Sequence, residues 1–353
     1  MTSSAPSLPG LRCSLHHADA LFELLQRDHI LGLFDFNTRS RADVHDDPRY
    51  LHVPLRPFGK PVVEIWHSSD PVVHGRDHGI SWAKNGTLLF GSIEIDEGSG
   101  GIATAAAEAY ACLNGFLTRH GYPCLWRIWN YMDAITCGTG DNERYRQFCI
   151  GRAKGMKRID TTTLPAATAI GRRDGMRRLQ VYWLAARSPG SPLENPRQIS
   201  AYHYPRQYGA QPPSFARAML PPATSAMPLI LSGTAAIVGH ASQHHDCVSA
   251  QLDEIFANFG SLAAIARQHR PSLPDIFGPD DLLKIYIRDE EDWPTVAARL
   301  NAHIDARIPR ILLHADICRT ELRVEIEGIL GTPSPAHHAH MSLTGMCAYH
   351  PTG

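Results

Sequence analysis

Charged and apolar residues alternate in LRVEIEG, residues 322–328, near the end of the chain. A period of two is typical of a β-strand with one apolar face, and it places Glu325 and Glu327 together on the other face, about 7 Å apart. Two neighbouring carboxylates suit general acid catalysis, because each raises the pKa of the other. The simpler interpretation is a face in contact with water. Cys318 and Arg319 lie just before this strand.

Arginine and aromatic residues are interleaved in two further segments. RYRQFCIGRA contains Arg152, and AYHYPRQYGAQPPSFARA contains Tyr204, Tyr208 and Arg217. A guanidinium group binds a carboxylate through paired hydrogen bonds, and aromatic rings can form the walls of a pocket for a small ring. The alternative for each segment is a surface loop whose arginine side chains lie along the protein surface.

Histidine residues gather in GHASQHHDC, residues 239–247, where a zinc or iron site has to be considered. His240 and His244 would share a helical face only if a helix had already begun, but the preceding TAAIVG is typical of a strand that runs into a loop. We therefore expect no metal ion here. His240 is predicted to be a loop residue that faces the substrate, with a capping or surface role as the alternative.

The elements that carry these residues occur twice. Each set has a strand, a long helix and a second strand, at 87–95, 102–121 and 124–132 and again at 229–239, 249–269 and 282–289. Corresponding residues lie 142, 144 and 143 positions apart, as in the pairs Gly91 and Gly233, Asn114 and Asn258, and Leu179 and Leu322. This nearly constant offset predicts a duplicated α+β unit.

Four segments follow from this repeat. We expect an N-terminal domain at residues 1–190, a Pro-rich linker at 191–213, a C-terminal catalytic domain at 214–332 and a flexible tail at 333–353. The first 50 residues are only weakly patterned.

The composition is that of a globular protein with room for about two domains, since 43% of the 353 residues are hydrophobic and 20% are charged. The 34 Lys and Arg residues nearly balance the 35 Asp and Glu residues. This balance argues against nucleic acid or a membrane surface as a partner. The eight cysteines form no CxxC pair, which favours reduced thiols and a cytoplasmic location. Neither a secretion signal nor a long apolar run is evident.

Four motifs in one order, RYRQFCIGRA, AYHYPRQYGAQPPSFARA, LSGTAAIVGHASQHHD and HADICRTELRVEIEG, resemble the chorismatase family. These enzymes remove pyruvate from chorismate. They include the 3- and 4-hydroxybenzoate synthases of the xanthomonadin pathway and the enzymes that make starter acids for macrolides. The resemblance implies an α+β fold of two tandem RidA/YjgF-like, chorismate mutase-like units, each a mixed β-sheet packed with helices.

The resemblance also implies roles for individual residues. Glu325 would be the catalytic acid. Arg152, Arg217 and Arg319 would hold the two substrate carboxylates. Tyr204 and Tyr208 would line the ring pocket above a floor made of Ser232, Gly233 and Thr234. His203 departs from the family pattern, in which a more basic residue is expected.

Chorismate is a dianion with an enol ether, and cleavage of that ether requires a proton on the terminal methylene carbon. A carboxyl with a raised pKa can supply it near neutral pH, without a metal ion or organic cofactor. Relatives that make hydroxybenzoates resemble this chain in having cysteine at position 318. Cys318 would guide the opening of an arene-oxide-like intermediate to 3- or 4-hydroxybenzoate, whereas attack by water would give a dihydroxycyclohexadiene carboxylate.

Two other interpretations remain at this point. One is a RidA-like imine deaminase, and the other is a non-catalytic module that binds an aromatic acid. In the favoured interpretation the partner is the small molecule chorismate, and the protein binds neither nucleic acid nor a membrane. It is expected to be a monomer or a trimer.

Overall fold

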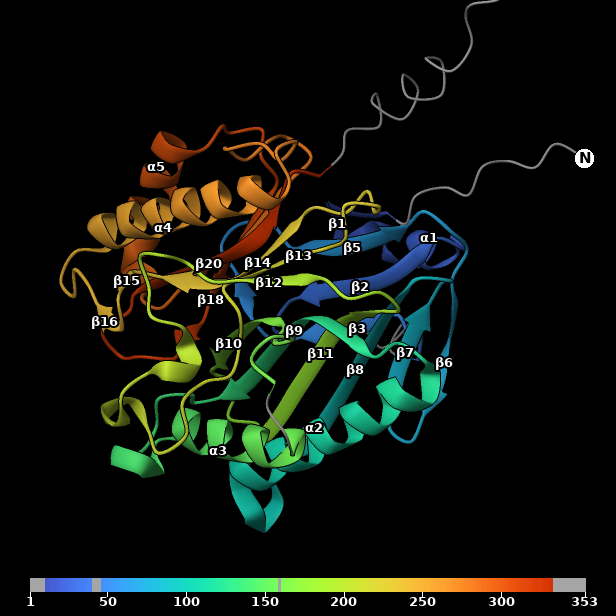
Figure 1. The fold of residues 1–353 in the computed structure, drawn as a ribbon, viewed down its shortest axis with the longest axis horizontal. Coiled ribbons are helices and arrows are strands. Elements are labelled where there is room, and N and C mark those ends of the chain that lie inside the picture. Colours follow the sequence, from blue (N-terminus) through green and yellow to red (C-terminus); the bar gives the residue numbers. More distant parts are fainter. Residues whose placement is uncertain (1–9, 40–45, 158–159, 333–353) are drawn as a thin grey trace, which may run out of the picture.

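Three β-sheets, built by successive parts of the chain, form the fold of the computed structural model (Figure 1). The structure describes residues 10–39, 46–157 and 160–332, so the predicted tail at 333–353 lies outside the described residues. The first sheet contains β1 (Leu11–His17), β2 (Ile30–Phe36), β3 (Tyr50–Val53) and β5 (Val62–Ser68), with the short helix α1 (Leu21–Leu25) after β1.

The second sheet contains β6 (Val73–Asp77), β7 (Ile80–Lys84), β8 (Leu88–Asp96), β9 (Cys124–Asp133), β10 (Ala166–Arg172) and β11 (Arg178–Ala186). Its helices are α2 (Gly101–His120) and α3 (Arg144–Met156). The third sheet contains β12 (Ser191–Leu193), β13 (Ala218–Leu220), β14 (Leu229–Ala235), β17 (Leu282–Ile287), β18 (Arg310–His314) and β20 (Val324–Leu330), with α4 (Val248–His269) and α5 (Trp293–His303). A small ribbon of β15 (Ile237–Val238) and β16 (Ala241–Ser242) follows β14.

The second and third sheets share one strand order. Their four main strands run β8-β11-β9-β10 and β14-β20-β17-β18, each with one parallel pair at the same end. The predicted α+β fold and its duplicated unit of mixed sheet and helices are therefore confirmed. The predicted strands and helices coincide with β8, α2, β9, β14, α4 and β17 to within a few residues.

The first sheet repeats this order without the long helices. It runs β1-β5-β2-β3, and β2 is parallel to β3 and antiparallel to β5. Sequence analysis did not predict this sheet. All seven residues of β2 are buried, so the strand has no alternating pattern, and α1 is too short to give a helical period.

Short strands connect the three sheets. β19 (Asp316–Ile317) follows β18 but pairs with β10 of the second sheet, and β4 (Arg56–Pro57) follows β3 but pairs with β18 of the third. Part of the predicted linker also belongs to a sheet, because β12 pairs with β13.

Helices α2 and α3 cover one face of the second sheet, and α4 and α5 cover one face of the third (Figure 1). The inner faces pack together through large side chains, among them Trp129, Tyr182 and Tyr286. In β20, Val324 and Ile326 pack toward α4, whereas Glu325 and Glu327 lie between the sheets with exposed fractions of 5% and 1%. The water-facing interpretation of this strand is therefore wrong.

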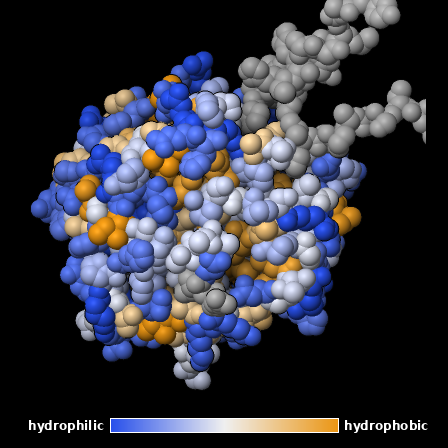
Figure 2. Space-filling view, in the orientation of Figure 1, coloured by the Kyte–Doolittle hydropathy of each residue, from blue (hydrophilic) through white to orange (hydrophobic). Residues whose placement is uncertain are grey.

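On the face drawn in Figure 2, hydrophobic residues form small scattered groups among hydrophilic ones. In the part of the chain that the structure describes, no helix is both long and apolar enough to cross a membrane.

Helix α3 lies close to α2 because Gly151 and Gly155 face it. A Cβ atom on Gly151 would lie 2.0 Å from the carbonyl oxygen of Ala103, and one on Gly155 would lie 2.4 Å from that of Ala107. Both contacts are with backbone, so neither can be relieved by a side-chain rotation. The two glycines thus set the position of α3 and of the side chains it carries.

We expect Gly151→Ala to lower the free energy of unfolding by about 2–4 kcal/mol, because α3 must move away from α2. Gly260→Ala in α4 is the matched control. A Cβ there would have no heavy atom within 4 Å, so this change should stabilise the protein by about 1 kcal/mol. Urea unfolding of both variants tests this, and equal stability of Gly151→Ala and the native protein would contradict it.

Candidate active site

A cavity of about 370 Å³ lies between the second and third sheets, a volume suited to a small organic molecule. Its walls come from β10 and α3 on one side and from β14, β20 and residues 318–321 on the other. Eight of the predicted site residues line it: Arg152, Tyr204, Tyr208, Arg217, Gly233, Cys318, Arg319 and Glu325. The structure places Ser232, Thr234 and His240 outside this lining.

A bulge in β14 shapes the cavity beside Glu325. The pairing of β14 with β20 shifts register between Leu231 and Thr234. The Ser232 hydroxyl donates to the carbonyl oxygen of Ala216 at 2.6 Å and accepts from the backbone N–H of Ala167 at 2.9 Å. Ser232 therefore joins the two sheets instead of forming the pocket floor.

Gly233 leaves room for the carboxyl group of Glu325. A Cβ atom at position 233 would lie 2.0 Å from Glu325 Oε1. The next residue, Thr234, turns its hydroxyl to the carbonyl oxygen of Ser232 at 3.0 Å. The bulge thus needs glycine at 233, and Thr234 supports it from behind.

Glu325 is buried, and no hydrogen bond to its carboxylate is found among the described residues. Burial, and then the negative charge of Glu327, raises its pKa to about 8, although Arg127 and Arg217 act in the opposite direction. Glu325 therefore holds a proton at neutral pH, as a general acid must.

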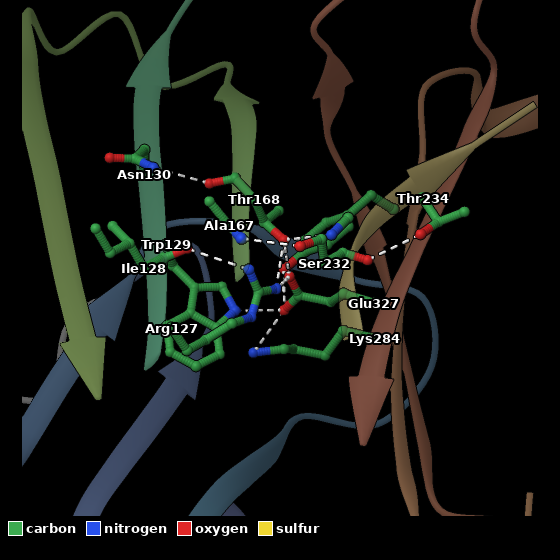
Figure 3. Close-up of polar contacts among 12 residues, drawn as sticks. Arg127, Ile128, Trp129, Asn130, Ala167, Thr168, Ser232, Thr234, Lys284 and Glu327 are labelled. Carbon is green, nitrogen blue, oxygen red and sulfur yellow. Dashed lines mark hydrogen bonds and ion pairs between the residues drawn. The ribbon is translucent and has the colours of Figure 1, made fainter. Parts of the chain in front are cut away.

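Glu327 has the opposite environment (Figure 3). Lys284 Nζ lies 2.9 Å from Oε1, and Arg127 Nη2 lies 2.6 Å from Oε2. Burial alone would raise the pKa of Glu327, but these cations and the hydroxyl of Thr168 outweigh it and lower the pKa. Glu327 does not line the cavity. It is a fixed anion behind the site.

Three guanidinium groups of the lining have no ion-pair partner among the described residues. Arg152 is buried over the ring of Tyr110, and its Nε and Nη2 have no hydrogen-bond partner there. Arg217 Nη2 donates to the Tyr204 hydroxyl at 2.8 Å, while its Nε has no partner. Arg319 donates only to neutral oxygens, one of them the carbonyl of His240. Their charges are available to an anionic ligand.

Aromatic rings hold these arginines. The Arg319 guanidinium carbon lies 3.9 Å from the ring centroid of Tyr208, and the Tyr204 ring lies 5.5 Å from the Tyr208 ring. The ring of His240 lies behind Tyr208, with Nδ1 3.3 Å from its hydroxyl oxygen. His240 therefore supports the wall.

Cys318 lines the cavity close to Glu325. Burial, followed by the charge of Glu325, raises the pKa of its thiol to about 12. The thiol therefore stays protonated, and in this state it can donate a hydrogen bond or exclude water but is a poor nucleophile.

Tyr145 and Phe215, aromatic residues of the two arginine-containing segments, also line the cavity, as expected of aromatic walls. Sequence analysis did not name Asn130 and Thr168, which line it as well. Asn130 and Thr168 lie in strands whose apolar sequences predict a buried core, and no sequence pattern indicates that either residue lines a site.

Within the described residues, no group of three His, Cys, Asp or Glu side chains is placed to hold a metal ion. In the histidine segment, His244 lies 3.4 Å from a carboxylate oxygen of Glu254, and His245 contacts the carbonyl oxygen of Ser242.

The environment of Glu325 predicts a stability effect. Its pKa in the folded protein, about 8, lies above its ordinary value of 4.5, so the stability it contributes is complete below pH 4.5 and is lost as the pH rises through 8. We therefore compare the free energy of unfolding of Glu325→Gln with that of the native protein. This difference should shift in favour of the variant by roughly 3–5 kcal/mol between pH 4 and pH 9, so that the variant is the more stable protein at pH 9. Thermal unfolding across this range measures the difference.

Glu321→Gln is the matched control for this effect. Burial opposes ionisation of Glu321, but a hydrogen bond from Ser242 outweighs it and lowers the pKa of Glu321. This substitution should therefore destabilise the protein above pH 4.5. A pH-independent effect of Glu325→Gln would show that Glu325 does not hold a proton in the folded protein.

Comparisons with known proteins give the family of this chain. Residues 64–185 match the family described as Chorismatase FkbO/Hyg5-like, N-terminal. A chorismatase of Streptomyces hygroscopicus is 38% identical over 76% of this chain and 78% of its own length. A 3-hydroxybenzoate synthase of the same organism is 33% identical over 78% of this chain and 83% of its own length. The crystal structure of a chorismatase superimposes with a TM-score of 0.81 at 34% identity, covering 92% of this chain and all of the other. The chain belongs to the chorismatase family.

Proposed function

We propose that this protein cleaves chorismate and releases pyruvate together with 3-hydroxybenzoate, 4-hydroxybenzoate or both. The observation that carries the proposal is a buried carboxyl, Glu325, whose pKa is raised to about 8, in a cavity with three arginines that form no ion pair with any described residue. The relative named chorismatase supports this substrate, and the relative named 3-hydroxybenzoate synthase supports 3-hydroxybenzoate as a product.

The two carboxylates of chorismate would be bound by Arg152, Arg217 and Arg319. Paired guanidinium hydrogen bonds select planar carboxylates, and the partly desolvated cavity strengthens each contact. The rings of Tyr204 and Tyr208 would lie along the substrate ring. This arrangement would leave the enol ether facing Glu325.

Glu325 would transfer its proton to the terminal methylene carbon of the enol ether, which becomes the methyl group of pyruvate. The positive charge that forms on the ether carbon is then stabilised by the negative charges of the new Glu325 carboxylate and of Glu327 behind it. This proton is enough to activate the ether, so no cofactor is part of the proposal.

The neighbouring ring hydroxyl would then displace pyruvate from the ring and lose its proton, giving an arene-oxide-like intermediate. Opening of this intermediate with loss of a ring proton gives a hydroxybenzoate. The protonated thiol of Cys318 would guide this opening and exclude water. If water attacked instead, the product would be a dihydroxycyclohexadiene carboxylate, and the enzyme would be a chorismate hydrolase.

Incubation of the purified protein with chorismate tests both steps. Pyruvate should appear in a 1:1 ratio with the sum of the aromatic acids, separated by liquid chromatography. Pyruvate with only the dihydroxycyclohexadiene acid would identify the hydrolase, and no pyruvate at all would refute chorismate cleavage.

We expect Glu325→Gln to reduce kcat by more than about 100-fold, because the amide retains the shape but cannot protonate carbon. In the native enzyme, kcat/KM should fall as the pH rises above about 8, since only protonated Glu325 is active. Chorismate binding to the variant, measured by calorimetry, should be nearly unchanged. Turnover close to normal in Glu325→Gln would refute the assignment.

Cys318→Ala should retain pyruvate release, because Glu325 and its strand are unchanged. The vacated space, about one sulfur atom, admits water, so part of the product should shift from hydroxybenzoate to the dihydroxycyclohexadiene acid or between the two hydroxybenzoates. Cys149→Ala, a change of the same kind at a buried thiol outside the cavity lining, is the control. An unchanged product ratio at a normal rate would mean that position 318 does not control the outcome.

A further inference from the structure

The three sheets share one strand order, so the active-site cavity has a counterpart position elsewhere in the fold. The cavity lies where β14, β20 and the segment after β18 face β10 of the neighbouring sheet. The corresponding elements one sheet earlier are β8, β11 and the segment after β10, which face β3. A second cavity, of about 820 Å³, lies at this position. Its lining includes Tyr50, Leu51, His52, Ser92, Ile93, Glu94, Arg172, Asp174, Met176, Arg178 and Gln180.

The second cavity has no acid at the catalytic position. The offset of 143 residues that relates β11 to β20 matches Tyr182 with Glu325. Tyr182 is completely buried and packs on Phe34 and Trp129, so it does not reach the cavity. This cavity therefore has no acid at the position that Glu325 occupies in the active site.

Two polar side chains of the lining each have one atom without a hydrogen-bond partner within the described residues. Arg172, 2% exposed, donates through Nη2 to backbone carbonyls, but its Nε has no hydrogen-bond partner and the Asp174 carboxylate lies 3.6 Å away. Gln180, 1% exposed, donates to Glu94 at 2.7 Å and to the carbonyl of His52 at 2.8 Å, while its Oε1 has no partner. A ligand that fits this cavity has a hydrogen-bond acceptor for Arg172 Nε and a hydrogen-bond donor for Gln180 Oε1.

Charge sets the class of ligand. Three arginines of the second lining, Arg76, Arg172 and Arg178, are balanced by Asp46, Glu94 and Asp174. The active-site lining has four arginines, against Glu143, Glu321 and the protonated Glu325. The second cavity therefore suits a dianion such as chorismate less well than the active site does, and a ligand with a single carboxylate can be bound by one of its arginines. Leu51, Pro54, Ile93 and Met176 give it an apolar wall against which a ring can pack.

We propose that the second cavity binds a ring-bearing hydroxy monocarboxylic acid, with its carboxylate at Arg172 and its hydroxyl donating to Gln180. Hydroxybenzoate is an acid of this class, so the cavity is a site for the product of the reaction. Only the identification of the ligand as product rests on the proposed function, because the binding chemistry follows from the cavity itself.

Calorimetric titration of the full chain with 3-hydroxybenzoate tests the site. Ser81, on the lining strand β7, allows the cavity to be filled by Ser81→Trp, with Ser81→Ala as the matched control. We expect two equivalents to bind to the native protein and to Ser81→Ala, and one to Ser81→Trp, whose turnover of chorismate stays normal. Arg152→Met should remove the other equivalent, at the active site.

The Arg152→Met variant gives an independent measurement, since only the second site is left in it. There, 3-hydroxybenzoate should bind about 10-fold more tightly than benzoate, which lacks the hydroxyl donor for Gln180. Two equivalents in folded Ser81→Trp, or complete loss of binding in Arg152→Met, would overturn the proposal. If the protein makes no hydroxybenzoate but Ser81→Trp still removes one equivalent, the proposed function fails and the second site stands.

Discussion

One buried cluster of charges connects all three sheets, and it includes Glu327 on β20, the strand that also carries Glu325. Glu64 comes from β5 of the first sheet, Arg127 from β9 of the second, and Lys284 and Glu327 from the third. Lys284 Nζ lies 3.0 Å from Glu64 and 2.9 Å from Glu327. A buried ion is costly unless it is paired, so each sheet is held in the register at which its ion meets the others.

The cluster also gives two neighbouring carboxylates, Glu325 and Glu327, different protonation states. Glu327 is held by Lys284, Arg127 and Thr168, whereas no group in the described residues donates a hydrogen bond to Glu325 two residues earlier on the same face. The first is therefore ionised, and its charge adds to burial in keeping the second protonated. Opposite environments for adjacent acids are a general way to obtain a proton donor at neutral pH.

Local periodicity was enough to predict the parts of this arrangement that repeat along the chain. The alternation in 322–328 placed Glu325 and Glu327 on one face, and the constant offset predicted β8, α2, β14 and α4. It could not predict that a second sheet covers the charged face, because that depends on contacts far away in sequence. The first sheet and the two-residue strands β4 and β19 were missed for a related reason, since fully buried or very short strands have no period. Thr168, in the Ala-rich β10, was missed as well.

The bulge in β14 explains why only one of the duplicated sheets carries the acid. Gly91 and Gly233 occupy matching positions, and each makes room for a large side chain of the neighbouring strand. In the second sheet the ladder is regular at Gly91, which pairs with Trp183, and the tryptophan packs on the outer face under the helices. In the third sheet the shifted register brings Ser232 and Gly233 both to β10, and the space is taken by Glu325 on the inner face. A shift of one residue exchanges the two faces of a strand. Gly91 therefore makes room for a core tryptophan in the second sheet, whereas Gly233 makes room for the acid between the sheets.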